Sequence, residues 1–463
     1  MTDWCPDLSR SNAPRYLAIA DTIESDIKSG RLTAGDRLPA QRDLARRLGL
    51  DFTTVARGYT EARRRGIISS QVGSGTYVST TSDIPKDTST RAPRRQSPPD
   101  HSMLLPPEPT DTTLLARMKS GFAALSADLV SLMRYQDLEA SEQDKQAGEK
   151  WLKDMQLQVS PERIAFAPGA QAALMAILQD LTSPGDLIAC EAITYPGIRS
   201  LCAQLGLGLI GLQTDGDGII PDALRSKCQT ETLRALYINP TLNNPTTRTI
   251  PEARRKELVN IAREFGIPIL EDDPYSPLLQ IPPKPFAELA PEQTWYIGSL
   301  SKSLGAGLRL AYVAAPDKSR AWSLQRALRT ASVMPSPMTV ALASLWIENG
   351  TAKAILDHVR DESAARQSLA GKMLGDFNIA TDEAAFHLWL NLPAAWTRSA
   401  FVSQIRHLPI GIVESDPFTV SGTPAEAVRI CFGGPVDRAR LSHALEEIAQ
   451  TLRSSPQSAS AFF

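Results

Sequence analysis

The sequence predicts an α/β protein built from a small N-terminal domain and a much larger C-terminal one. Three observations indicate this. The first 80 residues combine three helical periodicities with two short alternating strands. A stretch rich in Pro, Ser and Arg follows, and we expect it to be a flexible linker because its composition cannot bury a core. Beyond it, apolar runs typical of buried strands alternate with helical segments, which indicates a large mixed sheet with helices on both faces and a small C-terminal α/β domain.

Length and composition limit the classes of protein to consider. The chain of 463 residues is about three times a common domain length. Its formal net charge of −2 gives no overall preference for nucleic acid or membrane, and its five scattered cysteines predict reduced thiols and no metal site. With no signal peptide and no long apolar run, we expect a cytoplasmic protein. The expected boundaries are 12–79 for the first domain, 80–108 for the linker, 109–455 for the second domain and about 335–455 for its smaller part.

The N-terminal domain begins with three predicted helices. Residues 16–28 carry apolar side chains at helical spacing. Pro39 is placed to begin a second, short helix and Gly49 to end it, and a third helix opens at about Asp51 and runs to about Arg65. Two helices joined by a short glycine-containing turn are typical of the helix-turn-helix motif.

Two strands, 67–70 and 76–79, follow around a glycine-rich tip and predict a wing. Four motifs follow one another along this domain: Gly-Asp-x-Leu-Pro, Arg-x-Leu-Ala, Thr-Val and Gly-x-Gly-Thr-Tyr-Val. In these motifs and their order, the whole of residues 14–79 resembles the winged-helix DNA-binding domain of the GntR family. The resemblance implies that the third helix enters the major groove and that the wing tip reaches the minor groove or its phosphates.

On matching positions, the resemblance implies DNA contacts from Arg42, Thr53 and Thr54, with Arg57 as a further candidate. Gly75 would let the wing approach the DNA backbone closely. Phe52 stands where the family often has a polar or basic residue, and a thymine methyl is its expected contact. For the arginines at 63–65, near the end of the third helix, a solvated helix face is favoured over DNA contact.

The larger domain is organised around Lys302, which lies in a run of small residues between two apolar segments. A lysine that forms a Schiff base needs a pocket that lowers its pKa. Arg309, seven residues on, supplies a cation suited to a phosphate. If the Lys302 stretch is considered alone, the alternative is a surface lysine in a serine-rich loop.

Residues 267–270 read as a buried parallel strand, so that Asp272 leaves its C-terminal end, where α/β sheets bind ligands. Tyr275 follows three residues later. Together with Lys302 and Arg309, these residues resemble the signature of fold-type I pyridoxal-phosphate (PLP) enzymes, the aspartate aminotransferase superfamily. The resemblance covers roughly residues 110–455.

This resemblance implies roles for the matching residues. Lys302 would be the catalytic lysine that forms the internal aldimine with PLP, and Asp272 would keep the pyridine nitrogen of PLP protonated. Tyr275 would contact the ring hydroxyl. Three polar side chains would hold the phosphate group: Ser299, Ser301 and Arg309.

Further positions complete the expected PLP site. Ala170 and Gln171 begin a predicted helix whose backbone amides would bind phosphate, although a plain strand-to-helix turn would look similar. Tyr195 would stack on the ring of PLP. Asn244, in an element that resembles Asn-Pro-Thr-Gly, would donate to the ring hydroxyl oxygen. Because Thr247 replaces the glycine of that element, we expect a slightly different turn.

Arg429, on an alternating strand, matches the arginine that binds the α-carboxylate of an amino acid, with an exposed strand arginine as the alternative. Tyr135 matches the tyrosine that reaches the PLP phosphate of the other subunit, with a packed surface tyrosine as the alternative. We interpret His387 as structural, because no nucleophile or metal ligand accompanies it.

The combination of a winged helix, a linker and a PLP site resembles the MocR-type subgroup of GntR regulators. This implies a homodimeric regulator that binds double-stranded operator DNA and senses an amino acid, an amine or PLP itself through an aldimine at Lys302. The alternative is an active aminotransferase of amino acids that carries a DNA-binding domain, although we expect at most weak transamination. A third possibility is an empty site and constitutive repression.

Overall fold

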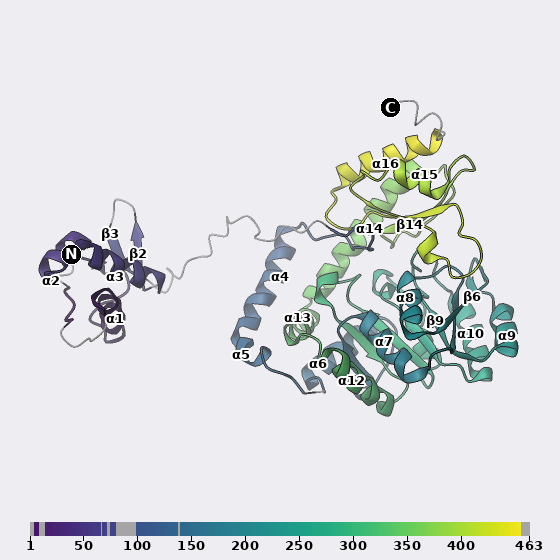
Figure 1. Ribbon diagram of the computed structural model, residues 1–463, viewed down its shortest axis with the longest axis horizontal. Coiled ribbons are helices and arrows are strands. Elements are labelled where there is room, and N and C mark those ends of the chain that lie inside the picture. The colour runs from purple at the N-terminus through teal and green to yellow at the C-terminus, as the bar shows by residue number, and fades with distance from the viewer. Residues whose placement is uncertain are drawn as a thin grey trace. The chain divides into compact units, whose positions relative to one another are not determined.

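The computed structural model describes residues 4–8, 14–65, 67–71, 75–79, 99–137 and 139–454 (Figure 1). The chain divides into two compact units, Met1–Pro98 and Pro99–Phe463. No helix among the described residues is long and apolar enough to cross a membrane.

The N-terminal unit has the predicted winged helix-turn-helix fold. The helices α1 (Arg15–Lys28), α2 (Gln41–Leu48) and α3 (Phe52–Arg64) pack around a core that includes Ile19, Ile23 and Tyr59. Gly49 ends α2 with a left-handed φ of 62°, and the Asp51 side chain caps α3 by accepting from the Thr53 amide. The wing strands β2 (Ile68–Gln71) and β3 (Gly75–Val78) are antiparallel, and β3 also pairs with β1 (Arg37–Leu38), a strand that the sequence pattern did not indicate.

A seven-stranded sheet in the order β4-β12-β11-β10-β9-β5-β6 forms the centre of the larger unit. Neighbouring strands are parallel except for β12, which is antiparallel to both β11 and β4. The sheet is therefore mixed, as predicted. Its strands are β4 (Ile164–Ala167), β5 (Leu187–Glu191), β6 (Gly208–Leu212), β9 (Leu233–Ile238), β10 (Ile269–Asp272), β11 (Thr294–Ser299) and β12 (Ala311–Ala314).

Helices cover both faces of this sheet. On one face, α7 (Ala170–Leu181), α8 (Pro196–Leu205) and α12 (Lys318–Ser332) share a core with Cys190, Tyr237 and Ile297. On the other face, α9 (Pro221–Thr230) and α10 (Glu252–Phe265) share a core with Ala189 and Ile269. The strands are buried on both sides, which explains their nearly continuous apolar sequence.

The smaller part of this unit is a four-stranded antiparallel sheet in the order β13-β14-β16-β15, covered by helices. Its elements are β13 (Ile379–Ala380), β14 (His387–Asn391), α15 (Arg398–Gln404), β15 (Gly411–Glu414), β16 (Ala427–Cys431) and α16 (Arg438–Arg453). The long helix α14 (Thr351–Leu374) joins the two parts, because its first half packs in the core with α13 and its last turns pack with α16 (Figure 1).

The remaining elements are short or peripheral. The helical stretch 112–132 is interrupted: the Ser126 hydroxyl donates to the Ala123 carbonyl, and a 3₁₀ turn separates α4 from α5. The elements are α4 (Thr112–Leu125), η1 (Ser126–Asp128), α5 (Leu129–Leu132), α6 (Glu142–Asp154), η2 (Pro161–Arg163), β7 (Thr214–Asp215), β8 (Gly218–Ile219), η3 (Ser276–Leu278), α11 (Phe286–Leu289), η4 (Ala306–Leu308), α13 (Pro337–Glu348) and η5 (Asp416–Phe418).

The chain around the expected linker differs in part from the prediction. Residues 80–98 lie outside the described residues, whereas 99–108 pack on the larger unit. Leu104 is only 2% exposed and belongs to the core that contains Trp151 and Leu300. Burial of this side chain holds the segment in place, together with hydrogen bonds that Lys302 and Arg429 donate to its backbone carbonyls.

Candidate functional site

The predicted ligand-binding residues of the larger unit lie near the C-terminal ends of the parallel strands. Asp272 is the last residue of β10, Ser299 is the last residue of β11, and Lys302 follows it in the turn. This is the edge at which open α/β sheets bind ligands. The smaller sheet adds Arg429 from β16, whose guanidinium donates to Asn244 Oδ1 at 3.0 Å.

Asp272 presents one carboxylate oxygen without a partner. Tyr237, on the neighbouring strand β9, donates its hydroxyl to Oδ2 at 2.8 Å, and the Asn239 side chain donates to the backbone carbonyl of Asp272 at 2.6 Å. The other oxygen, Oδ1, is buried and has no hydrogen-bond partner. Burial raises the pKa of Asp272 to about 7. A buried carboxylate with a free acceptor oxygen suits a cationic N–H group.

The Lys302 amine is buried, and its pKa is lowered. Burial lowers its pKa to about 8, and the positive charges of Arg429 and Arg309 act in the same direction. The nearby Cys431 and Asp272 oppose this shift. A larger fraction of the amine is therefore unprotonated near neutral pH than for an exposed lysine.

A polar cradle lies where α7 begins. Gly169 precedes this helix with a φ of 95°, and a Cβ atom placed on it would lie 2.7 Å from a terminal nitrogen of Arg309. The Arg309 guanidinium thus lies directly beside the backbone at the helix N-terminus, and Ala170 is the first residue of that helix. Ser299 and Ser301 are hydrogen-bonded to each other, with 3.1 Å between their hydroxyl oxygens. Free amides at a helix N-terminus next to an arginine suit a phosphate.

Tyr195 and Gln171 are positioned together. The Gln171 side-chain amide donates to the Tyr195 hydroxyl at 3.1 Å, and burial raises the pKa of that hydroxyl. Tyr195 directly precedes α8, so the start of this helix fixes its backbone. Gln171 Oε1 is buried without a hydrogen-bond partner. The Gln171 side chain therefore positions Tyr195, a role that the sequence did not indicate.

The loop that carries Asn244 is held by hydrogen bonds. The Asn244 amide donates to Asn239 Oδ1 at 2.8 Å, and the Asn244–Pro245 peptide bond is cis. Thr247, which we expected to change the turn, adopts a left-handed φ of 60°, a region that a glycine would enter more readily. Tyr275 is buried, and its ring lies 6.3 Å from that of Phe386, between centroids.

Arg429 is almost fully buried on β16. In addition to Asn244, its guanidinium donates to the backbone carbonyl of Ser102 at 2.6 Å and lies 5.0 Å from the centroid of the Phe418 ring. Its Nε is buried without a partner, and burial lowers the pKa of this side chain. The alternative of an exposed strand arginine is therefore wrong, because Arg429 is only 3% exposed.

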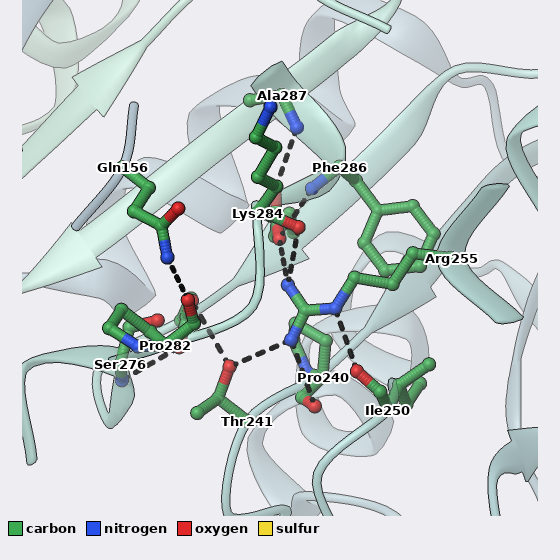
Figure 2. A network of polar contacts seen from close by, with 12 residues as sticks. Gln156, Pro240, Thr241, Ile250, Arg255, Ser276, Pro282, Lys284, Phe286 and Ala287 are labelled. Atoms are coloured by element: carbon green, nitrogen blue, oxygen red, sulfur yellow. Dashed lines mark hydrogen bonds and ion pairs between the residues drawn. The ribbon is translucent and has the colours of Figure 1, made fainter. Parts of the chain in front are cut away.

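Sequence reasoning missed the network around Arg255 (Figure 2). This fully buried arginine donates to the Ile250 carbonyl at 2.9 Å and to the Thr241 hydroxyl at 3.1 Å, and it pairs with Glu271 at 3.5 Å. Glu271 in turn accepts from the amides of Phe286 and Ala287. The network joins the end of β10 to the loop that holds Asn244. Three consecutive acidic residues, 271–273, at a strand end could have indicated a buried cation.

His387 lies near the same site. It is fully buried on β14, its ring centroid is 6.1 Å from that of Tyr275, and its Nε2 is 3.4 Å from the Asn243 carbonyl. Burial lowers its pKa to about 3, so the imidazole is neutral at physiological pH. These contacts support the structural interpretation of His387.

In the N-terminal unit, the predicted DNA-contacting residues lie on α2, α3 and β3. Arg42 is exposed on α2, with its guanidinium 5.9 Å from the centroid of the Phe52 ring. Arg57 lies on α3 over the Tyr16 ring at 4.3 Å, and the Thr53 hydroxyl donates to Asp51. Thr53 thus lies at the start of α3, Arg42 lies beside that start on α2, and Arg57 lies further along α3.

Two further predicted residues are Gly75 in the wing and Arg65 among the arginines at 63–65. Gly75 has a φ of 122° and lies beside the Arg37 side chain, while the wing tip at 72–74 is outside the described residues. Arg65 forms ion pairs with Glu61 and with two acidic residues of α1, Asp21 and Glu24. Arg65 therefore ties α3 to α1, and it is not part of the solvated helix face that we expected for residues 63–65.

Within the single chain, Tyr135 lies apart from the other residues that we predicted to bind PLP. It follows α5 and is 80% exposed. The alternative of a packed surface tyrosine does not fit this exposure.

Residues 110–448 match the profile of the family described as aminotransferase class I and II. The chain belongs to this family. Residues 15–78 match the family described as bacterial regulatory proteins, gntR family. A winged helix of the GntR type joined to an aminotransferase domain is the MocR-type arrangement, and the protein is a DNA-binding regulator of that kind.

Two transcriptional regulators are similar to this chain in sequence, and a solved aminotransferase is similar to it in fold. An uncharacterized HTH-type transcriptional regulator, YdeF, of Bacillus subtilis is 29% identical over 97% of this chain and 95% of its own length. The HTH-type pyridoxine biosynthesis transcriptional regulator PdxR of Corynebacterium glutamicum is 27% identical over 77% of this chain and 78% of its own. The crystal structure of Pyrococcus horikoshii kynurenine aminotransferase superposes with a TM-score of 0.69 at 21% identity, over 76% of this chain and 90% of that one, and shows the fold alone.

Proposed function

We propose that this regulator holds PLP in its aminotransferase domain and adjusts operator binding when a small amino compound reaches that site. The observation that carries the proposal is the set of complementary groups around Asp272 and Lys302. Asp272 Oδ1 lacks a partner, the pKa of Lys302 is lowered, and Arg309 lies beside the amides that begin α7. A pyridinium nitrogen, an aldehyde and a phosphate are the chemical groups that fit these three positions.

Each part of the site would hold a different part of PLP. The aldehyde of PLP, when bound, supplies an electrophilic carbon for Schiff-base formation with an amine. Asp272 Oδ1 would accept the ring N–H, Tyr195 would cover the ring face, and Lys302 would supply the amine. The phosphate would be bound by side chains and amides of Arg309, Ser299, Ser301, Ala170 and Gln171, while Asn244 and Tyr275 would lie at the ring hydroxyl.

Arg429 indicates the class of effector. A buried guanidinium with a free Nε suits a carboxylate, because a planar fork can donate two parallel hydrogen bonds to it. An amine next to that carboxylate could then reach the Lys302 position. We therefore propose an amino acid as effector, with an amine or PLP itself as the other ligands to test. The name of the Corynebacterium relative, a pyridoxine biosynthesis regulator, supports including PLP.

The surface around α5 supports a homodimer. Large apolar side chains are exposed there, and a cavity of about 270 Å³ lies between α5, α12 and the start of α13. Exposed apolar patches of this kind mark interaction surfaces. The exposed residues are Phe122, Leu129, Val130, Met133 and Tyr135. A second copy that covers them would bring Tyr135 to the partner's PLP site and two winged helices to two operator half-sites.

The test is a gel shift on the DNA upstream of this protein's own gene, with and without PLP and a panel of amino acids, alongside the visible spectrum. Specific binding that a compound changes, with an absorbance band typical of a Schiff base, is the expected result. The variant Lys302→Ala should lose the band and the response while keeping its fold. An unchanged response in this variant would contradict the assignment of Lys302.

No binding at low salt, together with steady keto-acid production from the same panel, would instead favour the aminotransferase alternative. Low salt is the appropriate condition because contacts with DNA phosphates are strongest there. Absence of the absorbance band in purified protein supplied with PLP would favour the empty site.

A further inference from the structure

The segment that leads into the larger unit, residues 99–108, lies against the two cations expected to bind a ligand. The Arg429 guanidinium donates to the Ser102 carbonyl at 2.6 Å, and the Lys302 amine donates to the Leu104 carbonyl at 2.5 Å. Both acceptors are backbone oxygens. Ser102 therefore holds the arginine that we assign to the effector's carboxylate.

This segment fits against the smaller sheet because Gly411, at the start of β15, and Gly433, just after β16, have no side chains. A Cβ atom on Gly433 would overlap the carbonyl oxygen of Leu105, and one on Gly411 would overlap that of His101. The Gly434 amide donates to the Pro106 carbonyl at 3.0 Å. The segment therefore packs along β15 and β16, and its backbone occupies the space that side chains at the two glycine positions would fill.

Two features make this contact suitable for exchange with a ligand. A neutral carbonyl accepts a weaker hydrogen bond from a guanidinium than a carboxylate does, so that a ligand carboxylate competes well for Arg429. The side chains of this stretch differ in how firmly they are held, since Leu104 is 2% exposed whereas Met103 is 48% exposed. The part next to Ser102 can therefore move at lower cost than the buried Leu104.

We propose that the Ser102 carbonyl is an internal competitor for the effector's carboxylate, and that a carboxylate ligand displaces residues 100–103 from Arg429 while Leu104 stays buried. The inference rests on the proposed function in one respect, the assignment of Arg429 to the ligand carboxylate. Residues 80–98 connect this segment directly to the DNA-binding unit, so its displacement changes the point at which the connection leaves the larger unit. Arg429 therefore links binding of a ligand carboxylate to the segment that continues into residues 80–98.

Hydrogen–deuterium exchange of the full-length protein loaded with PLP tests this displacement. The probe is propionate, which has the carboxylate but no amine, and propylamine is the matched control. We expect propionate to accelerate exchange of the amides at 100–103 roughly tenfold, while propylamine leaves them unchanged. In Arg429→Gln the propionate effect should disappear. Unchanged exchange at 100–103 in wild type at saturating propionate would overturn the proposal.

Two glycine variants test the competition without altering Arg429 or Lys302. Gly433→Ala should displace the segment in the absence of ligand, because the three atoms nearest to its new Cβ all belong to Leu105 and Pro106. Propionate should then bind roughly tenfold more tightly than to wild type, since the competing carbonyl is gone. Gly371→Ala, on an open face of α14, is the control with no neighbour within 4 Å.

Equal propionate affinity in Gly433→Ala and wild type, with exchange at 100–103 already fast in the variant, would also overturn the proposal. If Gly433→Ala does not fold, Gly411→Ala and the wild-type exchange measurement provide the same test. Operator binding is scored separately by gel shift. A wild-type protein that binds no operator would refute the proposed function, whereas the exchange data alone decide whether carboxylate displaces Ser102.

Discussion

The most informative single atom in the molecule is Asp272 Oδ1, which is buried without a partner while Oδ2 accepts from Tyr237. Leaving a buried acceptor unsatisfied is costly, so such atoms are rare outside binding sites. The sequence identified Asp272 through its position after a strand. Only the structure shows that one of its two oxygens is left free for a ligand.

At this position we predict that Asp272→Asn weakens PLP binding roughly tenfold or more, because an amide cannot neutralise a cationic ring nitrogen. Titration of PLP-free protein with PLP, followed by visible absorbance, measures the dissociation constant. Tyr237→Phe is the matched control: it removes the hydroxyl from Oδ2 but keeps the carboxylate, and its effect should be smaller. Equal PLP affinity in Asp272→Asn and wild type would contradict the role of Asp272.

Lys302 gives a prediction about pH and stability. Its pKa falls from 10.5 in the unfolded chain to about 8 in the folded one because the amine is buried. Between these values the unfolded chain binds a proton that the folded chain does not, so the free energy of unfolding of PLP-free protein rises with pH across this window. Relative to Lys302→Met, the gain should approach roughly 3 kcal/mol.

Denaturant unfolding of the two PLP-free proteins at several pH values between about 8 and 10 checks this sign. Taking the difference between wild type and Lys302→Met removes the contributions of the other buried groups, including Asp272, whose pKa is raised to about 7. A difference that stays constant with pH would mean that the Lys302 amine is as well solvated in the folded chain as in the unfolded one.

At the scale of elements, the α2-turn-α3 unit shows how well local sequence signals specify local structure. Gly49 ends α2 and Asp51 caps α3. The sequence predicted the end at Gly49 and a helix that opens at about Asp51, and the structure adds the capping role of the Asp51 side chain. Arg42, exposed on α2, lies beside Phe52 at the start of α3. This arrangement presents a guanidinium next to the helix expected in the major groove.

We therefore predict that Arg42→Ala weakens operator binding and lowers the salt dependence of log Kd by about one unit, as expected for the loss of one phosphate contact. Gel shifts at several salt concentrations measure both quantities. Arg31→Ala removes the same charge from an exposed residue that pairs with Asp26 outside the two helices, and it should change operator binding little. An unaltered salt dependence in Arg42→Ala would contradict the phosphate contact.

Another element, the segment 99–108, shows where sequence reasoning fails. Its prolines and polar residues led us to expect linker throughout, yet it packs on the larger unit. The contacts to Arg429 and Lys302 are made by the backbone carbonyls of Ser102 and Leu104. Every residue type has such a carbonyl, so no sequence pattern can indicate these contacts.

At the scale of the whole molecule, the exposed apolar side chains near α5 predict assembly. Val130 is 72% exposed, and a second copy would bury it. We expect Val130→Asp to weaken dimerisation roughly a hundredfold, because the interface would have to bury an unpaired charge. Size-exclusion chromatography with light scattering measures the mass. Ile281→Asp, at an 85% exposed position between η3 and α11, should leave the dimer intact. A wild-type monomer, or a Val130→Asp dimer of equal stability, would contradict this surface.

The sequence by itself determined the two-part organisation, because turn glycines and buried-strand runs are local signals. It also indicated candidate ligand-site residues: Asp272 through its position at a strand end, and Lys302 and Arg309 through the run of small residues that carries them. Only the tertiary structure revealed the Arg255–Glu271 network, the pairing of Gln171 with Tyr195 and the packing of residues 99–108 against Arg429. Each of these contacts joins residues that lie apart in the sequence, and only the packing of the fold brings them together. Burial and backbone groups contribute to these contacts, and neither is specific to one residue type.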